Sequence, residues 1–152
     1  MLSNHHKNVA AVIHLSALSK FIFPLGNFIM PLIIWTLNKD KSDFVDKHGK
    51  QAINFQLSIL LYTFLVASIT IPLFLFGVLN HIDFPEFWHA YDFDFDFHLS
   101  NHDSFNVIIF SILAGLLVVA AFILEIIFII IATSKANQGE PYKYPLTINF
   151  LK

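Results

Sequence analysis

The chain has 152 residues, of which 56% are hydrophobic and 13% charged, and its formal net charge is −2. A soluble domain carries roughly 25% charged residues, so this composition predicts a single integral membrane domain over residues 1–152, with the lipid bilayer as a partner. The absence of Cys excludes disulfides, thiolate chemistry and Cys-based zinc sites.

The first apolar segment, residues 9–37, follows a short polar tail at residues 1–8 and is interrupted at Pro24, Gly26 and Pro31. Neither part of this segment reaches the roughly 20 residues that a membrane span needs. Pro lacks the backbone N–H that a helix interior uses, so a break near Pro24 is expected.

Two paths fit this broken segment: one long kinked span, or a re-entrant helical hairpin that turns at residues 24–27. Lys7 and Lys20 favour the hairpin, because it keeps the N-terminus and these charges on the cytoplasmic side. Trp35 lies near the end of the segment, where an indole favours the membrane interface.

Residues 38–52 form a polar hinge that contains four Lys residues. A helix is expected to begin at Ser42 or Asp43, which can cap it. Asp46 then lies in the first turn, where the helix dipole favours an acid. The hinge is therefore predicted to be an interfacial helix that leads directly into the next span.

Three further hinge residues have expected packing or charge roles. Gly49 allows the close approach of another backbone, and His48 is expected to form a hydrogen bond across the hinge. Lys50 belongs to the Lys cluster, which orients the chain in the membrane. An alternative role for these Lys residues is to bind anionic headgroups, to which each would contribute about 1 kcal/mol.

Residues 53–79 are the clearest span. Asn54, Ser58 and Tyr62 recur every four residues and so share one helical face, and Gln56 adds a second amide. Such stripes usually face another helix and form hydrogen bonds with it. The alternative is a conducting path lined by these groups, which would require an oligomer or a partner protein because four short helices do not enclose a pore.

Residues 80–104 form a long acidic loop without Lys. Within it, residues 91–97 alternate Asp with aromatic side chains, which is the period of an extended strand. Imidazole and carboxylate groups suit a divalent metal. The candidate ligands are His89, Asp92, Asp94, Asp96, His98 and His102. The alternative is a solvated loop whose Phe side chains dip into the outer interface.

Glu125 lies deep in the last apolar span, residues 105–138. At 100° per residue it shares a helical sector with Ser111, Gly115 and Phe122, so it is expected to face protein. The Ser111 and Gly115 spacing lets helices approach closely. An ionisable group at this depth costs about 2.5–3.5 kcal/mol unless it is neutralised or paired.

Two roles fit Glu125. The first is a proton or cation relay with His14 or Lys20 as its partner. The second is a protonated or hydrogen-bonded structural carboxyl that holds the helices together. The second role is favoured, because a single carboxyl is thin support for a pathway.

The tail, residues 139–152, begins with a helix stop at Gly139, and Pro141 prevents the helix from continuing. Tyr142 and Tyr144 suit the headgroup level of a membrane.

Topology follows from the distribution of Lys. The hinge at residues 38–52 and the C-terminus are expected in the cytoplasm, and the Lys-free loop at residues 80–104 outside. The two long spans are then antiparallel.

Four motifs together resemble a known family: HLSAL at residues 14–18, PLIIW at 31–35, FVDKHGKQAINFQ at 44–56 and KANQGEPYKYPLTI at 135–148. They are similar to a bacterial family of small membrane proteins of unknown function. That family is grouped, more distantly, with the twenty-kilodalton subunit of the chloroplast inner-envelope import machinery, the Tic translocon. The resemblance implies the bacterial inner membrane as the location and brings no catalytic residues.

The expected architecture is all-α and integral to the membrane: a Pro-broken N-terminal helical hairpin and two long antiparallel spans, four helices in all. The expected function is that of a non-enzymatic subunit or accessory factor of a larger membrane complex, in protein translocation or membrane-protein biogenesis. No cofactor and no nucleic-acid partner are expected. The alternatives are a homo-oligomeric transporter that uses Glu125 and the stripe at 54, 58 and 62, and an extracytoplasmic metal or ligand binder that uses residues 80–104.

Overall fold

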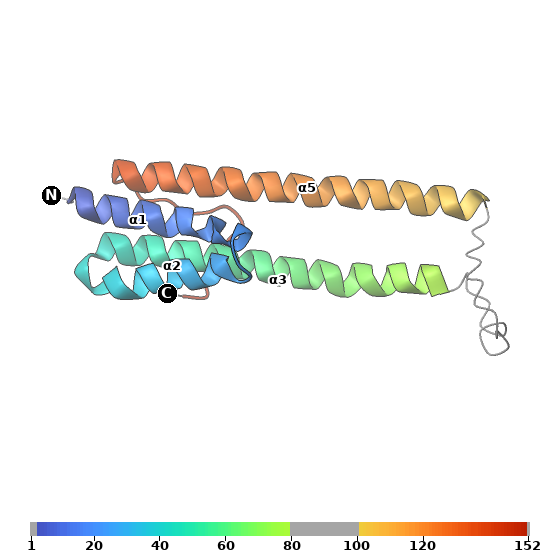
Figure 1. Ribbon diagram of the computed structural model, residues 1–152, viewed down its shortest axis with the longest axis horizontal. Coiled ribbons are helices and arrows are strands. Elements are labelled where there is room, and N and C mark those ends of the chain that lie inside the picture. Colours follow the sequence, from blue (N-terminus) through green and yellow to red (C-terminus); the bar gives the residue numbers. More distant parts are fainter. Residues whose placement is uncertain (1–2, 80–100, 152) are drawn as a thin grey trace. The chain divides into compact units, whose positions relative to one another are not determined.

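The computed structural model describes residues 3–79 and 101–151. Within these residues the chain is all-helical and has no strand, which confirms the predicted all-α class. The elements in chain order, shown in Figure 1, are α1 (Asn4–Ser16), the short 3-10 helix η1 (Ala17–Phe21), α2 (Gly26–Asn38), the 3-10 helix η2 (Lys39–Lys41), α3 (Asp43–Leu79) and α5 (Asn101–Gln138). The strand-like alternation at residues 91–97 lies outside the described residues.

The chain divides into two units. We call residues 1–62 and 121–152 the four-helix unit, and residues 63–120 the second unit. The four-helix unit contains α1, α2, the beginning of α3, the end of α5 and the tail. It also holds all the polar residues that the sequence singled out in the hairpin, the hinge and the stripe, together with Glu125.

The first helix begins earlier than the sequence predicted. α1 starts at Asn4, within the stretch expected to be a polar tail, because Ser3 caps it: the Ser3 Oγ accepts a hydrogen bond from the His5 N–H at 3.2 Å. The first turn of α1 is polar, so the apolar pattern did not mark it.

The connection between η1 and α2 reverses the chain, which gives the predicted hairpin and not one long kinked span. α1 packs against α2, and Leu25 before α2 adopts a left-handed conformation with φ 61°. A Cβ on Gly26 would lie 2.5 Å from the Ser19 carbonyl oxygen, so only glycine fits there. Pro31 does not interrupt α2, contrary to expectation: it lies inside the helix with its ring buried.

α3 runs without a break for 37 residues, so the predicted interfacial helix and span form one helix. α5 begins at Asn101, four residues before the predicted start of the last span, and the loop predicted over residues 80–104 is shorter at that end. The first residues of α5 are polar, and the prediction followed the apolar run.

α5 ends at Gln138, at the predicted stop. Gly139 adopts φ 83°, its N–H bonds to the Ala136 carbonyl at 3.0 Å, and the Glu140 N–H bonds to the Lys135 carbonyl at 2.9 Å. These two bonds satisfy carbonyl groups that the helix end would otherwise leave free.

Two helical stretches are long and apolar enough to cross a membrane, Asp43–Leu75 and Ile108–Gln138. In the second unit they expose large apolar side chains, among them Leu73, Leu117 and Val118. Extended apolar surface of this kind marks contact with a membrane or with another protein.

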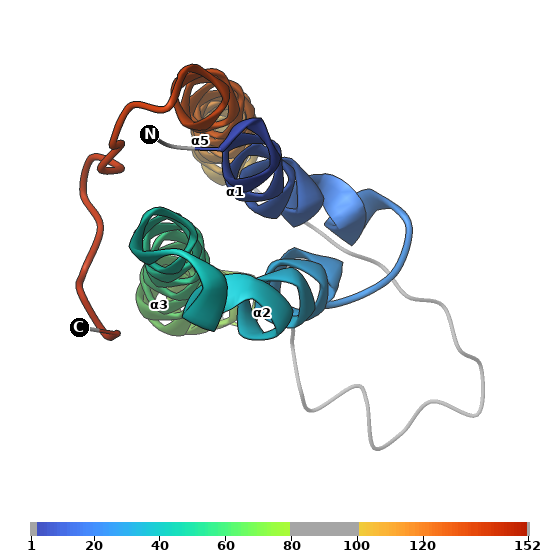
Figure 2. The same ribbon diagram turned by 90° about the vertical axis from the view of Figure 1, so that its left-hand side faces the viewer.

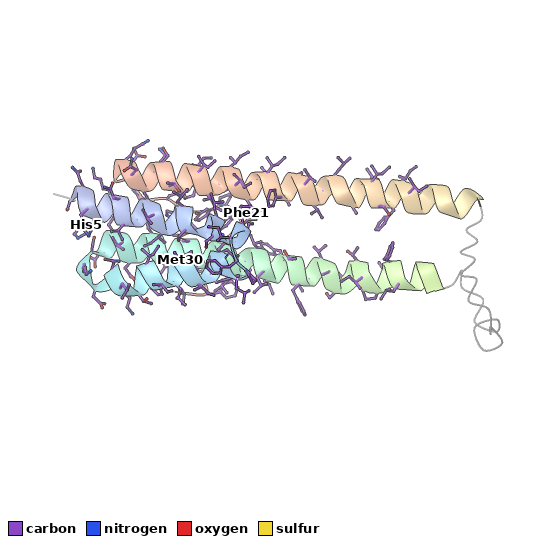
Figure 3. The ribbon with its side chains drawn as sticks, viewed as in Figure 1. His5, Phe21 and Met30 are labelled. Carbon is purple, nitrogen blue, oxygen red and sulfur yellow. The ribbon has the colours of Figure 1, made fainter. Side chains whose placement is uncertain are left out.

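The core of the four-helix unit combines small and large side chains. Ala10 of α1 meets Ala136 of α5, where small residues let the helices approach, and Ile13 packs with Trp35 of α2. Figure 2 shows the four helices side by side, with the tail crossing from α5 to α3. In Figure 3 the side chains fill the space between these helices, and Phe21 marks the end of η1.

Candidate functional site

The four-helix unit encloses a network of buried polar side chains. His14 of α1 is fully buried, with its Nε2 2.8 Å from His48 Nδ1 on α3 and its Nδ1 2.9 Å from the Tyr144 hydroxyl. Aromatic rings enclose the network: Tyr144 stacks on Phe55 with 4.0 Å between ring centroids, and Phe44 lies 4.3 Å from His48. The first helix, the hinge and the tail are therefore joined through one imidazole.

The hydrogen bonds of His14 relate the position of the proton on its own ring to that on the His48 ring. A neutral imidazole has one N–H donor and one acceptor nitrogen. When the Tyr144 hydroxyl donates to Nδ1, His14 donates from Nε2 to His48, and His48 then carries its proton on Nε2. Among the described residues no hydrogen bond of full geometry reaches His48 Nε2, although the Glu140 backbone lies close to it.

Burial keeps His14 and Tyr144 uncharged. His14 belongs to α1, outside the two stretches able to span a membrane, and burial together with the neighbouring His48 lowers its pKa to about 3. Burial, with smaller effects of Tyr142 and Glu125, raises the pKa of the Tyr144 hydroxyl well above its usual range. The network therefore supplies a fixed set of hydrogen bonds at neutral pH.

Acidification should destabilise the four-helix unit. The pKa of His14 is about 3 in the folded chain and 6.5 in its reference state, so the unfolded chain binds a proton first as pH falls. The contribution of His14 to stability is full above about pH 6.5, falls by about 1.4 kcal/mol per pH unit below it, and is about 2 kcal/mol lower at pH 5. Thermal unfolding in detergent, followed by circular dichroism from pH 8 to pH 5, measures this slope. His14→Gln should make the slope shallower and the exposed-site control His5→Gln should keep it; equal slopes in both would contradict the account.

Lys20 and Glu125 form an ion pair between η1 and α5. Lys20 Nζ lies 2.6 Å from Glu125 Oε2, and the two side chains are 22% and 8% exposed. Lys20 Nζ also lies 5.2 Å from the centroid of the Phe122 ring. Of the two partners considered for Glu125, the structure thus places Lys20 against it, while His14 bonds to His48 and Tyr144.

The polar stripe of α3 binds the C-terminal tail. Asn54 Nδ2 donates to the Leu151 carbonyl at 3.0 Å, and the Leu151 N–H donates to Asn54 Oδ1 at 2.8 Å. Ser58 Oγ accepts from the Ile148 N–H at 2.9 Å, and the Tyr62 hydroxyl donates to the Leu146 carbonyl at 2.8 Å. The stripe therefore pairs with the backbone of the tail.

Gln56 belongs to a different face of α3. Its Oε1 accepts a hydrogen bond of 2.8 Å from Asn27 Nδ2 on α2. Gln56 thus makes the inter-helix amide contact that the sequence predicted more generally for Asn54 and Gln56.

Replacing Asn54 by Leu should release the end of the tail. Two hydrogen bonds to Leu151 disappear, each worth about 1 kcal/mol net, and Ser58 alone cannot hold residues 149–151. Hydrogen exchange read by mass spectrometry should show faster exchange over residues 146–151 and unchanged exchange in α1. Thr36→Val, which removes a hydroxyl that bonds only within α2, is the matched control. Protection of the tail equal to that of the unchanged protein would contradict this role of Asn54.

The hinge is held against α2. Trp35 Nε1 donates to Asp46 Oδ1 at 2.9 Å, and Lys50 Nζ lies 2.6 Å from Asp46 Oδ2. Gly49 faces the Trp35 ring so closely that a Cβ would lie 2.1 Å from its Cδ1. Trp35, predicted near the membrane interface, is buried within the four-helix unit, where its indole N–H donates to the Asp46 carboxylate.

Sequence reasoning missed Tyr144, which was expected at the headgroup level. The structure buries it, with its hydroxyl on His14. A buried Tyr needs a hydrogen-bond partner, and His14 supplies it from the other end of the chain. No local pattern marks a contact between such distant residues.

The predicted metal ligands cannot be placed in a site. His89, Asp92, Asp94, Asp96 and His98 lie outside the described residues, and His102 falls in the first turn of α5. Within residues 3–75 and 108–151, whose side chains the structure describes, no group of three His, Asp or Glu side chains is arranged to hold a metal ion.

Comparison with known proteins gives one family. The model of the MamF/MmsF family, described as the magnetosome magnetite crystal formation protein family, matches residues 5–151. No curated protein and no solved structure matches the chain. The resemblance drawn from the sequence was correct at the level of a small bacterial membrane family, and a link to the chloroplast import subunit is not shown. The chain belongs to the magnetosome magnetite crystal formation protein family.

Proposed function

We propose, from this family membership, that the chain is a non-enzymatic integral membrane protein that acts in magnetosome biogenesis as an accessory factor or subunit of a larger membrane assembly. The observation that carries the proposal is the family match over residues 5–151. It includes both apolar helical stretches and every member of the buried network. The narrower role in protein translocation, implied by the import-subunit resemblance, gains no support from the match.

The use of the polar groups favours an accessory role over a transporter. A transporter would need Glu125 and the stripe of Asn54, Ser58 and Tyr62 along an open path. Glu125 is instead paired with Lys20, and the stripe binds the tail. Groups engaged in this way hold a scaffold together, and they leave the apolar surface for contact with lipid or another membrane protein.

The hinge and the tail support the proposed topology. Asn54, just after the hinge, bonds to Leu151 near the C-terminus, so both Lys-bearing segments belong to the same side of the membrane. By the bias of Lys toward the cytoplasm, this side is cytoplasmic and residues 80–104 face the opposite compartment.

Cysteine labelling should show this topology directly, because the chain has no Cys of its own. In sealed right-side-out vesicles, a membrane-impermeant maleimide should label Ser100→Cys before lysis and Lys41→Cys only after lysis. Lys143→Cys should behave like Lys41→Cys. Labelling of Lys41→Cys and Lys143→Cys on opposite sides would contradict the shared location of hinge and tail.

The accessory role is tested by purification from a magnetite-forming bacterium. A tag on the N-terminus leaves Leu151 free to bond to Asn54. Magnetosome membranes are isolated, extracted in mild detergent and bound through the tag, with an untagged strain as the control, and the recovered proteins are identified by mass spectrometry. We expect recovery from the magnetosome fraction with at least one other membrane protein in stoichiometric amount. Recovery as an isolated homo-oligomer would favour the transporter, and absence from the magnetosome fraction would contradict the proposal.

A further inference from the structure

A cavity of about 570 Å³ lies between the first turns of α3 and the tail, within the four-helix unit. Its volume falls in the range of small-molecule sites, roughly 300–1,000 Å³. The side chains that matter for its chemistry are Phe44, Lys47, His48, Lys50, Gln51 and Lys143.

The surface of the cavity is mostly apolar, and its charged groups are all positive. Three Lys side chains face the cavity, and none of its lining residues is Asp or Glu. Lys50 is neutralised by Asp46, with 2.6 Å between Nζ and Oδ2, whereas Lys47 and Lys143 form no ion pair within the described part of the chain. The N-terminal end of α3 adds a partial positive charge, because Phe44 and Lys47 belong to its first turns.

Two buried polar atoms at this cavity lack a partner. His48 is 2% exposed, and its Nε2, which the bond to His14 leaves free, has only the Glu140 backbone near it, without a hydrogen bond of full geometry among the described residues. Gln51 Oε1 is also buried without a hydrogen-bond partner among the described residues. Buried polar atoms normally have hydrogen-bond partners. A ligand that accepts a hydrogen bond from His48 and donates one to Gln51 would supply the two missing partners.

We propose that this cavity binds a phosphate group, supplied either by a phospholipid headgroup or by free phosphate. Phosphate oxygens accept from Lys ammonium groups and, when the Tyr144 hydroxyl donates to His14, from the N–H that His48 then carries on Nε2. A hydroxyl of a hydrogen phosphate, or of a glycerol headgroup, would donate to Gln51. The Phe44 side chain supplies an apolar wall beside these groups. This inference does not depend on the role in magnetosome biogenesis.

The test uses the full chain purified in a neutral detergent. Binding of phosphatidylglycerol and of phosphatidylcholine is measured by native mass spectrometry, and binding of inorganic phosphate by equilibrium dialysis. The variant Lys47→Gln with Lys143→Gln removes the two Lys charges that lack an ion pair. The matched control, Lys7→Gln with Lys41→Gln, removes the same charge outside the cavity. Circular dichroism checks that both variants are folded.

We expect saturable binding that weakens about thirty-fold in the cavity variant, because each Lys near the surface contributes about fivefold, and less than twofold in the control. Binding of phosphatidylglycerol without binding of inorganic phosphate identifies a headgroup site, and saturable binding of inorganic phosphate identifies a free-phosphate site. In either case the ring resonances of His48 should shift on saturation in an NMR spectrum of His-labelled protein. Absence of saturable binding, equal weakening in both variants, or unchanged His48 resonances at saturation would overturn the proposal.

Discussion

Gly49→Ala should destabilise the four-helix unit by about 3 kcal/mol. The added Cβ would lie 2.1 Å from Trp35 Cδ1 and 2.4 Å from its Cγ, distances at which the indole must move. Trp35 is buried and bonded to Asp46, so its movement costs packing as well as a hydrogen bond. Overpacking of this kind costs about 1–3 kcal/mol and occasionally more, and a lost hydrogen bond adds about 1 kcal/mol.

The matched control is Gly115→Ala, which also lies inside a long helix. A Cβ there meets nothing within 4 Å, and Ala favours a helix over Gly by about 1 kcal/mol. Thermal unfolding in detergent should therefore lower the midpoint for Gly49→Ala and leave Gly115→Ala unchanged or slightly higher. Adding Trp35→Leu to Gly49→Ala should recover part of the loss, because it makes room for the methyl group. Equal midpoints for the two single Ala variants would contradict the close contact of α2 and α3.

Glu125→Leu should cost about 3 kcal/mol. It removes the carboxylate that lies 2.6 Å from Lys20 Nζ and leaves the Lys charge against the Phe122 ring. Removing one partner of a buried pair typically costs about 3–5 kcal/mol, and the partial exposure of Lys20 places the effect at the lower end. The measurement is the free energy of unfolding in detergent, compared with the unchanged protein.

A double variant separates the lost pair from a packing defect. Lys20→Met combined with Glu125→Leu removes both charges and should unfold within about 1 kcal/mol of the unchanged protein, since apolar replacements of buried pairs are often neutral. Glu125→Gln keeps an acceptor for Lys20 and should keep the fold. A double variant that is as unstable as Glu125→Leu alone would show that the ion pair is not the reason for the loss.

The fold could be predicted from the sequence where local chemistry decides it. The hairpin break follows from the interruption at Pro24 and the stop of α5 follows from Gly139, because both act on their own backbone. Helix starts were less predictable. Both α1 and α5 begin with polar residues, over which the apolar periodicity that predicts a helix does not extend. Pro31 was misjudged because the sequence pattern around it does not show that its ring is buried inside α2.

The sequence predicted several residues of the candidate site, but not the contacts that they make. His14, His48 and Glu125 stand out because each is a polar group in or beside an apolar run, where it needs a partner. Their partners did not stand out, because contacts such as His14 with Tyr144 join opposite ends of the chain. The binding of the tail by Asn54 and Ser58 could not be predicted for the same reason. A polar stripe on a helix does not indicate whether its partner is another helix or an irregular segment of the chain.

The central claim is a role in magnetosome biogenesis, and magnetite crystals report on it most directly. The gene is deleted in a magnetite-forming bacterium and restored on a plasmid, and crystal number, length and shape are measured by electron microscopy. We predict fewer or smaller crystals in the deletion strain, and recovery with the unchanged chain and with Gly115→Ala but not with Gly49→Ala. Crystals that are indistinguishable in the deletion strain and its parent would contradict the account.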